Sequence, residues 1–330
     1  MKIHLNPLNP LGFILGACYL FGQKIDRARR STQAKHAQYP TICVGNFQAG
    51  GTGKTPATMW VAKQLKSLGY SPIILIRGYK GSVQKSTLVD SDDAHIYGDE
   101  ALLHAQLFPT IVGKNRRDSA QLASTITGDK KVLVMDDGLQ HYELLKDFSI
   151  VCQKSLRFEL DHMLPMGRIR EIPHTNIHAI LSQINDAGYH PVESWKGIPE
   201  YTFERITALV SGGKEQGLVV CGVANPDDCF YQIQKVGGFI GNEMKFRDHH
   251  RYSAADLARI EKASEKYEYR VHCTAKDAVK LAPLIKAENS PIRLSVWDVE
   301  IQPVGDVQPL LDAMVAKIEE VYKNRSQKQA

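Results

Sequence analysis

Short apolar runs alternate with helical patterns along most of the chain, and polar turns separate them. The apolar runs predict β-strands at residues 41–44, 72–76, 110–112, 132–135, 148–152, 178–181, 218–223, 270–273 and 292–299. Apolar residues at helical spacing predict helices that include residues 57–68, 100–107, 254–266 and 309–322. Strands that alternate with helices favour an α/β fold built on a parallel sheet.

A stretch that is richer in glycine, proline and polar residues, 185–213, divides this pattern and is interpreted as a connector. A chain of 330 residues is long enough for two domains. We therefore place a domain boundary near residue 205. The first domain is expected over 1–205, and a smaller α/β domain that includes the C-terminal helix is expected over 206–330.

The N-terminal segment departs from the alternating pattern, because residues 11–21 are apolar on nearly every face of a helix. Asn9 and Pro10 suit the N-cap and first turn, so we expect a helix over about 9–30. Its apolar part is too short to span a bilayer, which takes about 20 residues. Basic residues follow directly, at Lys24, Arg27, Arg29, Arg30 and Lys35. Such a helix is expected to lie in the headgroup region of an anionic membrane; the alternative is a buried core helix with a solvated basic end.

Composition narrows the class of protein. Hydrophobic residues make up 43% of the chain and charged residues 23%, which is typical of a globular protein. The net charge of +5 is small for a nucleic-acid-binding protein of this size, so no nucleic-acid partner is expected. The six cysteines include no Cys-x-x-Cys pair, and we interpret them as thiols in a reducing compartment, not as a disulfide framework or zinc site.

A glycine-rich segment between the strand at 41–44 and the following helix carries the most specific chemistry. Small residues there let backbone N–H groups surround phosphate oxygens, and the helix N-terminus adds the positive end of its dipole. Lys54 is expected to reach the β- and γ-phosphates of a nucleotide, and the Thr55 hydroxyl to bind Mg²⁺. The predicted nucleotide-binding residues are Gly50, Gly51, Thr52, Gly53, Lys54 and Thr55.

This loop is not a strict Walker A motif. Gln48 occupies the position of the first glycine, and Ala49 stands where partition-type ATPases have a signature lysine. A glycine-rich turn that binds nothing is the alternative interpretation. The preceding strand, the following helix and the Lys-Thr pair favour a phosphate loop for a nucleoside triphosphate.

Two adjacent acids, Asp136 and Asp137, follow the apolar run at 132–135. In a phosphate-loop fold the carboxyl end of such a strand faces the Mg²⁺ of the bound nucleotide. We therefore interpret both acids as metal-binding residues, and the alternative is an ordinary Asp-Asp-Gly turn.

Three further groups are candidates for catalysis. Asp99 precedes a helix, where it is either an N-cap or a functional acid. The segment Asp248-His249-His250 either contains structural histidines or presents an imidazole as a general base. Arg170 lies in a loop-like region, where it is either an ordinary surface residue or a group that neutralises phosphoryl charge.

As a set, the motifs resemble one family in their order and spacing, from the N-terminal helix to about residue 300. They are Val44-Gly45-Asn46, the loop at 50–56, Arg77-Gly78-Tyr79, Gly98-Asp99-Glu100, the Asp-Asp-Gly-Leu-Gln-His run at 136–141, the segment 164–171, Asn225-Pro226, Asp248-His249-His250 and the Lys-Asp-Ala-Val run at 276–279. This set is similar to that of the tetraacyldisaccharide 4′-kinases, the lipid A 4′-kinases. The chain departs from the family pattern at Ile76, Lys80 and Ala275, where serine, glycine and glutamate are usual.

The resemblance implies a transfer of the γ-phosphate of ATP, with Mg²⁺, to the 4′-hydroxyl of a tetraacylated glucosamine disaccharide 1-phosphate. It implies a peripheral protein at the cytoplasmic face of the inner membrane. Its expected partners are that glycolipid and the anionic membrane surface, with no obligate protein partner. It also implies a P-loop domain joined to the smaller α/β domain by a β-linker, with the site in the cleft between them.

The resemblance also assigns roles to residues. Asp99 and His249 are expected to face each other across the cleft, with His250 as the substitute if His249 is not the base. The expected catalytic residues are Asp99, His249, Lys54 and Arg170; the metal-binding residues are Thr55, Asp136, Asp137 and Glu171; the substrate-binding residues are Asn46, Arg77, Gly78, Tyr79, Gln140 and His141.

Two other functions are open at this point. One is a nucleotide-switch ATPase or GTPase of the partition or metal-insertion type, whose commonest version is disfavoured by the missing signature lysine. The other is a soluble small-molecule kinase whose N-terminal helix serves only core packing.

Overall fold

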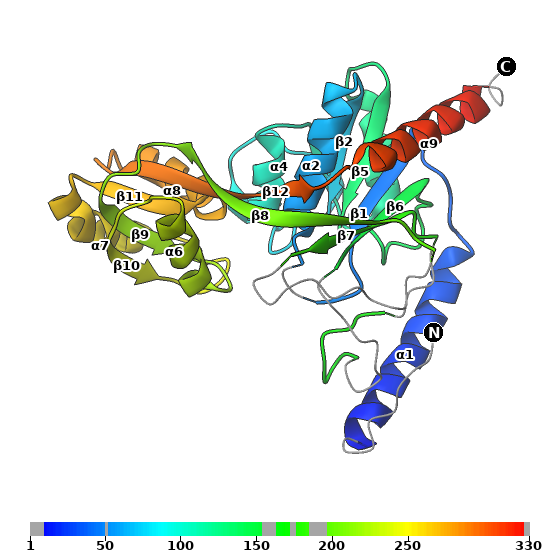
Figure 1. Cartoon of the computed structure of the whole chain (residues 1–330), viewed down its shortest axis with the longest axis horizontal. Helices are drawn as coiled ribbons and strands as arrows, with labels where there is room; N and C mark the ends of the chain where they lie inside the picture. The colour runs from blue at the N-terminus through cyan, green and yellow to red at the C-terminus, as the bar shows by residue number, and fades with distance from the viewer. Residues whose placement is uncertain (1–9, 50–51, 154–162, 172–175, 185–196, 327–330) are drawn as a thin grey trace.

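The computed structural model of the protein describes residues 10–49, 52–153, 163–171, 176–184 and 197–326. One sheet of twelve strands runs through it in the order β10-β9-β11-β12-β8-β7-β6-β1-β5-β2-β4-β3 (Figure 1). The strands are β1 (Thr41–Gly45), β2 (Ser71–Ile76), β3 (Thr87–Leu88), β4 (Thr110–Val112), β5 (Lys131–Asp136), β6 (Phe148–Gln153), β7 (Ala179–Gln183), β8 (Glu200–Ser211), β9 (Gly217–Cys221), β10 (Ile240–Lys245), β11 (Arg270–Thr274) and β12 (Arg293–Val304). The helices are α1 (Pro10–Ser31), α2 (Lys54–Ser67), α3 (Ala94–Tyr97), α4 (Asp99–Ala105), α5 (Arg116–Leu122), α6 (Pro226–Lys235), α7 (Ala254–Ser264), α8 (Ala275–Ala287) and α9 (Gln308–Ser326).

The larger part of the molecule has a parallel sheet at its centre. β7, β6, β1, β5, β2 and β4 pair in parallel in this order, and the short edge strand β3 pairs antiparallel with β4. Val44 and Val134 belong to one apolar cluster, while their neighbours Cys43 and Leu133 belong to another. Because successive residues of a strand point to opposite faces, the two clusters bury both faces of the sheet.

The smaller part extends the same sheet. β10, β9, β11 and β12 pair in parallel, and α6, α7 and α8 surround them (Figure 1). Val220 and Val271 of the strands form a buried cluster with Leu257 and Ile260 of α7 and Leu281 of α8. The prediction of a P-loop-type parallel sheet with a second, smaller α/β unit is confirmed.

Two long strands, β8 and β12, join the two parts (Figure 1). They pair antiparallel over most of their length, and β8 also pairs in parallel with β7. The expected β-linker is therefore present. Of the expected connector 185–213, residues 200–211 form the long strand β8, while 185–196 lie outside the described residues. The boundary expected near 205 falls inside this strand.

α9 packs on the larger part. Leu310, Met314 and Ile318 of this helix lie in the same buried cluster as Val61 of α2 and Ile42 of β1. The chain returns to the larger part through β12, which ends immediately before α9. This packing differs from the expectation that the C-terminal helix belongs to the smaller domain.

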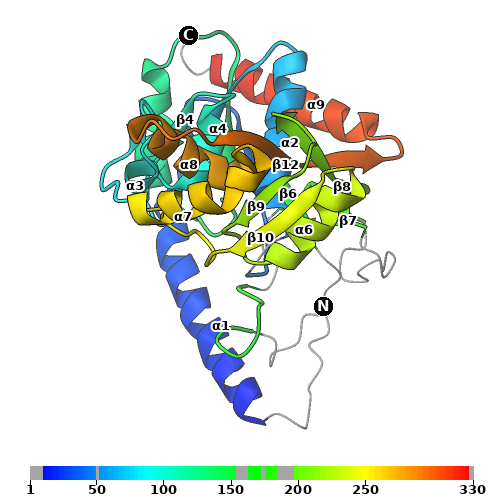
Figure 2. The same ribbon diagram turned by 90° about the vertical axis from the view of Figure 1, so that its left-hand side faces the viewer.

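α1 projects away from the sheet (Figures 1 and 2). Tyr19 and Leu20 pack against the buried cluster of the larger part. The other side of the helix carries a stripe of exposed apolar residues, which are Leu11 (61% exposed), Ile14 (57%), Phe21 (68%) and Ile25 (55%). Their spacing of three, seven and four residues places them on one face of a helix. Among the described helices, none is long and apolar enough to cross a membrane.

Candidate active site

The phosphate loop joins β1 to α2 at the carboxyl edge of the parallel sheet. Gly53 adopts φ 78° and is the N-cap of α2, so a side chain at this position would be strained. Lys54 and Thr55 are the first two residues of α2. Thr52 is buried, and its hydroxyl accepts a hydrogen bond from Asn46 Nδ2 at 2.5 Å. The predicted residues Gly50 and Gly51 lie outside the described residues.

A second segment pairs with the start of this loop. The N–H of Ala49 donates to the carbonyl of Arg168 at 2.6 Å, and the N–H of Arg170 donates to the carbonyl of Phe47 at 2.8 Å. These bonds hold Arg170 beside the loop, as its predicted role requires. Its carbonyl in turn accepts a hydrogen bond from Gln23 Nε2 of α1 at 2.9 Å.

The predicted acids lie beside the loop lysine. Asp136 ends β5, and Asp137 follows it with φ 51°. Lys54 Nζ lies 3.8 Å from Asp137 Oδ1, and Arg170 Nη1 lies 3.0 Å from Asp137 Oδ2. The structure therefore brings Lys54 and Arg170, both predicted to be catalytic, together with the two predicted metal-binding acids.

The acids fit a Mg²⁺ ion. Oδ1 of Asp136 and Oδ1 of Asp137 are buried and accept no hydrogen bond within the described part of the chain. Burial raises the pKa of Asp136, but the hydrogen bond from His104 and the positive charge of Lys54 outweigh it and hold the pKa below its usual value. Two carboxylates with free oxygens suit Mg²⁺, which commonly takes one or two carboxylates together with substrate phosphates and water.

Glu171 differs from the other predicted metal ligands, because its carboxylate is surrounded by protein donors. Tyr142 donates its hydroxyl hydrogen to Oε1 at 2.6 Å, and Gln140 Nε2 donates to Oε2 at 3.2 Å. Arg27 Nη1 of α1 lies 3.7 Å from Oε1. Gln140 Nε2 also donates to the carbonyl of Asn46 at 3.1 Å. Glu171 therefore links α1 to the phosphate loop through predicted site residues.

Asp99 and His249 meet across the two parts of the molecule. Asp99 is the first residue of α4 and is 6% exposed, whereas His249 lies in the loop before α7. His249 Nδ1 lies 2.8 Å from Asp99 Oδ2 and 3.1 Å from Oδ1. His250 instead places Nε2 3.1 Å from Asp256 Oδ2. The geometry thus pairs His249, not His250, with Asp99.

The environment of Asp99 favours its charged form. Burial raises the pKa of Asp99, but the hydrogen bond with His249 and the charges of His249, Lys276 and Lys280 outweigh it, so the pKa is lowered. An ionised Asp99 accepts the hydrogen of Nδ1 and leaves Nε2 of His249 as the basic nitrogen.

The Arg77-Gly78-Tyr79 motif lies beside this pair. Tyr79 is 59% exposed, and its ring meets the His249 ring edge-on with centroids 5.4 Å apart. At Gly98, with φ 83°, a Cβ would stand 2.5 Å from the carbonyl oxygen of Tyr79. The missing side chain lets the motif approach the start of α4.

The predicted substrate residue His141 has its pKa lowered to about 2 by burial and by Arg116 and Lys146, so its imidazole is neutral.

Two site residues were missed by sequence reasoning. His104 of α4 is fully buried, and its Nε2 lies 2.8 Å from Asp136 Oδ2. Arg116, the first residue of α5, is 2% exposed, and its Nε and Nη2 are buried without hydrogen-bond partners among the described residues. Burial lowers the pKa of Arg116 to about 10, while the charges of Asp136 and Asp137 oppose that shift. His104 could have been found as a polar residue within an apolar helical pattern, whereas Arg116 lies in a polar stretch and gives no such signal.

We expect His104→Leu to destabilise the protein, because it removes a donor from a buried carboxylate. Such a loss costs roughly 1–3 kcal/mol. His104→Gln keeps a donor and is expected to recover part of this loss. Urea unfolding of both variants measures the difference, and equal stabilities would show that the hydrogen bond to Asp136 contributes little.

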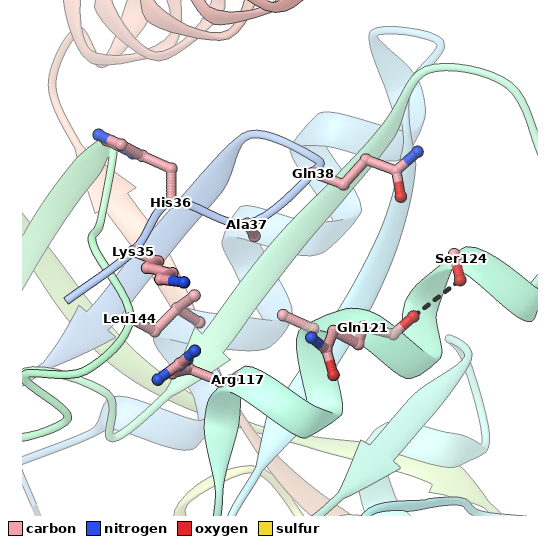
Figure 3. A pocket seen from close by; sticks show the side chains of 9 residues that line it. Lys35, His36, Ala37, Gln38, Arg117, Gln121, Ser124 and Leu144 are labelled. Carbon is pink, nitrogen blue, oxygen red and sulfur yellow. Dashed lines mark hydrogen bonds between the residues drawn. The ribbon is translucent and has the colours of Figure 1, made fainter. Parts of the chain in front are cut away.

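A cleft of about 470 Å³ adjoins the Asp99–His249 pair. Its walls come from the loop at 91–95 and α3 on one side and from α8 on the other, and Lys280 also lines it. A second hollow of about 300 Å³ lies between residues 35–38 and α5 (Figure 3). Lys35 and Arg117 line this hollow, and it includes none of the predicted site residues.

A family model described as tetraacyldisaccharide-1-P 4′-kinase matches residues 6–319. The chain belongs to this family. The tetraacyldisaccharide 4′-kinase of Rhizobium meliloti is 32% identical over 288 residues, which cover 83% of this chain and 80% of that protein. That of Paramagnetospirillum magneticum is 32% identical over 302 residues, which cover 88% and 90%.

A solved structure shares the fold of this 4′-kinase family member. The crystal structure of LpxK from Aquifex aeolicus in complex with ATP superposes with a TM-score of 0.70 and 21% identity. The match covers 92% of this chain and 96% of that one. The resemblance read from the motifs is confirmed, and the nucleotide-switch alternative is not favoured.

Proposed function

We propose that the protein transfers the γ-phosphate of ATP to the 4′-hydroxyl of a tetraacylated glucosamine disaccharide 1-phosphate, a step of lipid A synthesis. The observation that carries the proposal is the Asp99–His249 pair at the cleft between the smaller part and the part that bears the phosphate loop. A base at this cleft can take the proton from the hydroxyl of an acceptor substrate. A nucleotide-hydrolysing switch has no such acceptor substrate. Membership in the 4′-kinase family supports the choice of acceptor.

On the donor side, the phosphate loop binds ATP and positions its γ-phosphate. Thr55, Asp136 and Asp137 would hold Mg²⁺, which supplies charge neutralisation at the phosphates. Lys54 and Arg170 stabilise the negative charge that the phosphoryl oxygens carry during transfer. Both cations contact Asp137 in this structure, so they are already directed toward the metal-binding acids.

On the acceptor side, His249 takes the proton of the sugar hydroxyl. Asp99 fixes the tautomer by accepting the hydrogen of Nδ1, and its charge stabilises the imidazolium that forms. Arg77, Gly78, Tyr79 and His141 are proposed to bind the polar part of the glycolipid. Asn46 and Gln140 contact the loop and Glu171, so we assign them to the junction of donor and acceptor.

Incubation with γ-labelled ATP, Mg²⁺ and a purified tetraacylated disaccharide 1-phosphate tests the proposal. We expect the label on the 4′-position of the glycolipid. A second incubation offers a soluble sugar phosphate as acceptor. Label that appears only as free phosphate, or only on the soluble acceptor, would contradict the proposed function.

We further propose that the protein binds the cytoplasmic face of the inner membrane through α1. The exposed stripe of Leu11, Ile14, Phe21 and Ile25 would enter the headgroup region. The basic residues farther along the same helix would contact anionic lipids. The exposure of this stripe argues against a helix that serves core packing alone.

Charge reversal on α1 is expected to weaken this binding. Lys24→Glu with Arg29→Glu should lower binding to anionic vesicles about thirtyfold at low salt, because each cation near such a surface contributes about 1 kcal/mol. Arg27 is left unchanged because it contacts Glu171. Vesicle sedimentation at low and high salt measures the effect, which salt should reduce.

The matched control is Lys235→Glu with Lys262→Glu, which changes the charge equally at exposed positions of the smaller part. Its vesicle binding is expected to remain close to that of the unmodified protein. Equal losses in the two double variants would show that net charge, not α1, determines membrane binding.

A further inference from the structure

A largely buried lysine of α8 lies in the cleft beside the Asp99–His249 pair. The side chain of Lys280 on α8 is 8% exposed, and its Nζ makes no hydrogen bond within the part of the chain that the structure describes. Nζ lies 3.8 Å from Asp99 Oδ2 and 3.2 Å from Asp277 Oδ1. Lys280, Asp99 and His249 all line the cleft of about 470 Å³.

Asp277 does not depend on Lys280 for hydrogen bonds. Its Oδ2 accepts the N–H of Gly222 at 3.0 Å and the hydroxyl hydrogen of Thr274 at 2.8 Å, and its Oδ1 accepts that of Tyr252 at 2.9 Å. A carboxylate with three donors is already well stabilised. The second acid within 4 Å of Lys280 is Asp99, so the ammonium charge also acts on the proposed base pair.

We propose that Lys280 is a positioning residue that keeps the imidazole of His249 neutral and able to accept a proton. This inference rests on the proposed function. A carboxylate beside a histidine stabilises the imidazolium, and a cation beside that carboxylate offsets this effect. Without Lys280, less positive charge would offset Asp99, and a larger fraction of the protein would carry a protonated, inactive base.

Lys276 also acts on Asp99, and its charge contributes to the lowered pKa of that acid. Its Nζ is engaged by Glu100 Oε1 at 2.7 Å, whereas Lys280 has no hydrogen-bond partner among the described residues. Asp248 Oδ1 lies 3.8 Å from His249 Nε2 and adds to the negative field. The charged and titratable groups around the pair come from every element that packs near it. They are Asp92 and Asp93 before α3, His95 of α3, Glu100 of α4, Tyr79 and Lys80 after β2, Asp248, Arg251 and Tyr252 before α7, and Lys276, Asp277 and Lys280 of α8.

The pH dependence of kcat/KM for the glycolipid tests the inference. The acidic limb of this pH profile is the range in which transfer falls as the base becomes protonated. For Lys280→Met we expect this limb to move to higher pH by about half a unit to one unit. Transfer at pH values below the limb should then fall by roughly three- to tenfold, with near-normal transfer at high pH. Lys280→Arg keeps the positive charge, so its acidic limb should lie at the same pH as in the unmodified protein. Lys286→Met, at an exposed position of the same helix, is the matched control and should leave it unchanged.

A second measurement does not depend on transfer. The His249 ring can be titrated by NMR, with its signal assigned by comparison with His249→Gln. We expect the pKa of His249 to rise in Lys280→Met by the same amount as the limb moves. Transfer that is lowered equally at every pH, together with an unshifted His249 titration, would overturn the inference.

The two proposals fail in different ways. Absence of transfer to the glycolipid by the unmodified protein would contradict the proposed function, whereas the NMR titration would still test the effect of Lys280. Unfolding curves of each variant identify a general loss of stability. If Lys280→Met is too unstable to titrate, Lys280→Gln provides the uncharged comparison for Lys280→Arg.

Discussion

Lys54→Ala is expected to lower phosphate transfer by about 10²- to 10³-fold at saturating ATP, because it removes a cation that stabilises the charge on the transferred phosphoryl group. In this structure Lys54 Nζ lies 3.8 Å from Asp137 Oδ1 and its side chain is 14% exposed. The ion pair is long, and Asp137 keeps the closer contact with Arg170 at 3.0 Å, so the loss of Lys54 should leave the fold intact. Single-turnover transfer from labelled ATP measures the effect.

Lys63→Ala on the same helix is the matched control. Lys63 contacts Glu300 at 2.6 Å, and both side chains are about half exposed. Such an exposed pair contributes little to stability, so transfer should be unchanged. Near-normal transfer by Lys54→Ala at saturating ATP, with bound nucleotide confirmed by calorimetry, would show that the loop has been assigned wrongly.

The strands of the larger part were predictable because they are buried on both faces and read as continuous apolar runs. All five residues of β1 and five of the six residues of β5 are buried. β8 lacks this signal, because most of its residues are half-buried or exposed and polar residues are frequent in it. β10, at the edge of the sheet, lacks it for the same reason. α9 was recognised as a helix, but no local pattern indicates that it packs beside α2.

The donor side of the site was predictable from local sequence, whereas the acceptor side was not. Lys54 and Asp136 each follow directly from a strand and the residues after it. Asp99 and His249 are 150 residues apart, and each alone is ambiguous, so their pairing depended on the family resemblance. His104 escaped notice because it occupies an apolar face of α4, where its contact with Asp136 depends on tertiary packing.

The largest remaining effects are expected at Asp99 and His249. A sugar hydroxyl is a poor nucleophile at neutral pH, so its proton must leave as the phosphoryl group arrives. Asp99→Ala and His249→Ala should each lower kcat by roughly 10²-fold or more, within the range that loss of a general base allows. His250→Ala is the matched control, since His250 neighbours His249 but contacts Asp256. It should retain most of the transfer activity.

The double variant distinguishes a pair from two independent residues. Because Asp99 acts by orienting His249 and stabilising its imidazolium, Asp99→Ala in the His249→Ala background has little left to remove. We therefore expect the kcat of the double variant to lie close to that of the slower single variant, measured at saturating ATP and glycolipid. Fully additive losses would show that the two residues work separately. Asp99 would then be assigned to the metal-binding acids beside Asp136 and Asp137, and the base would have to be sought elsewhere in the cleft.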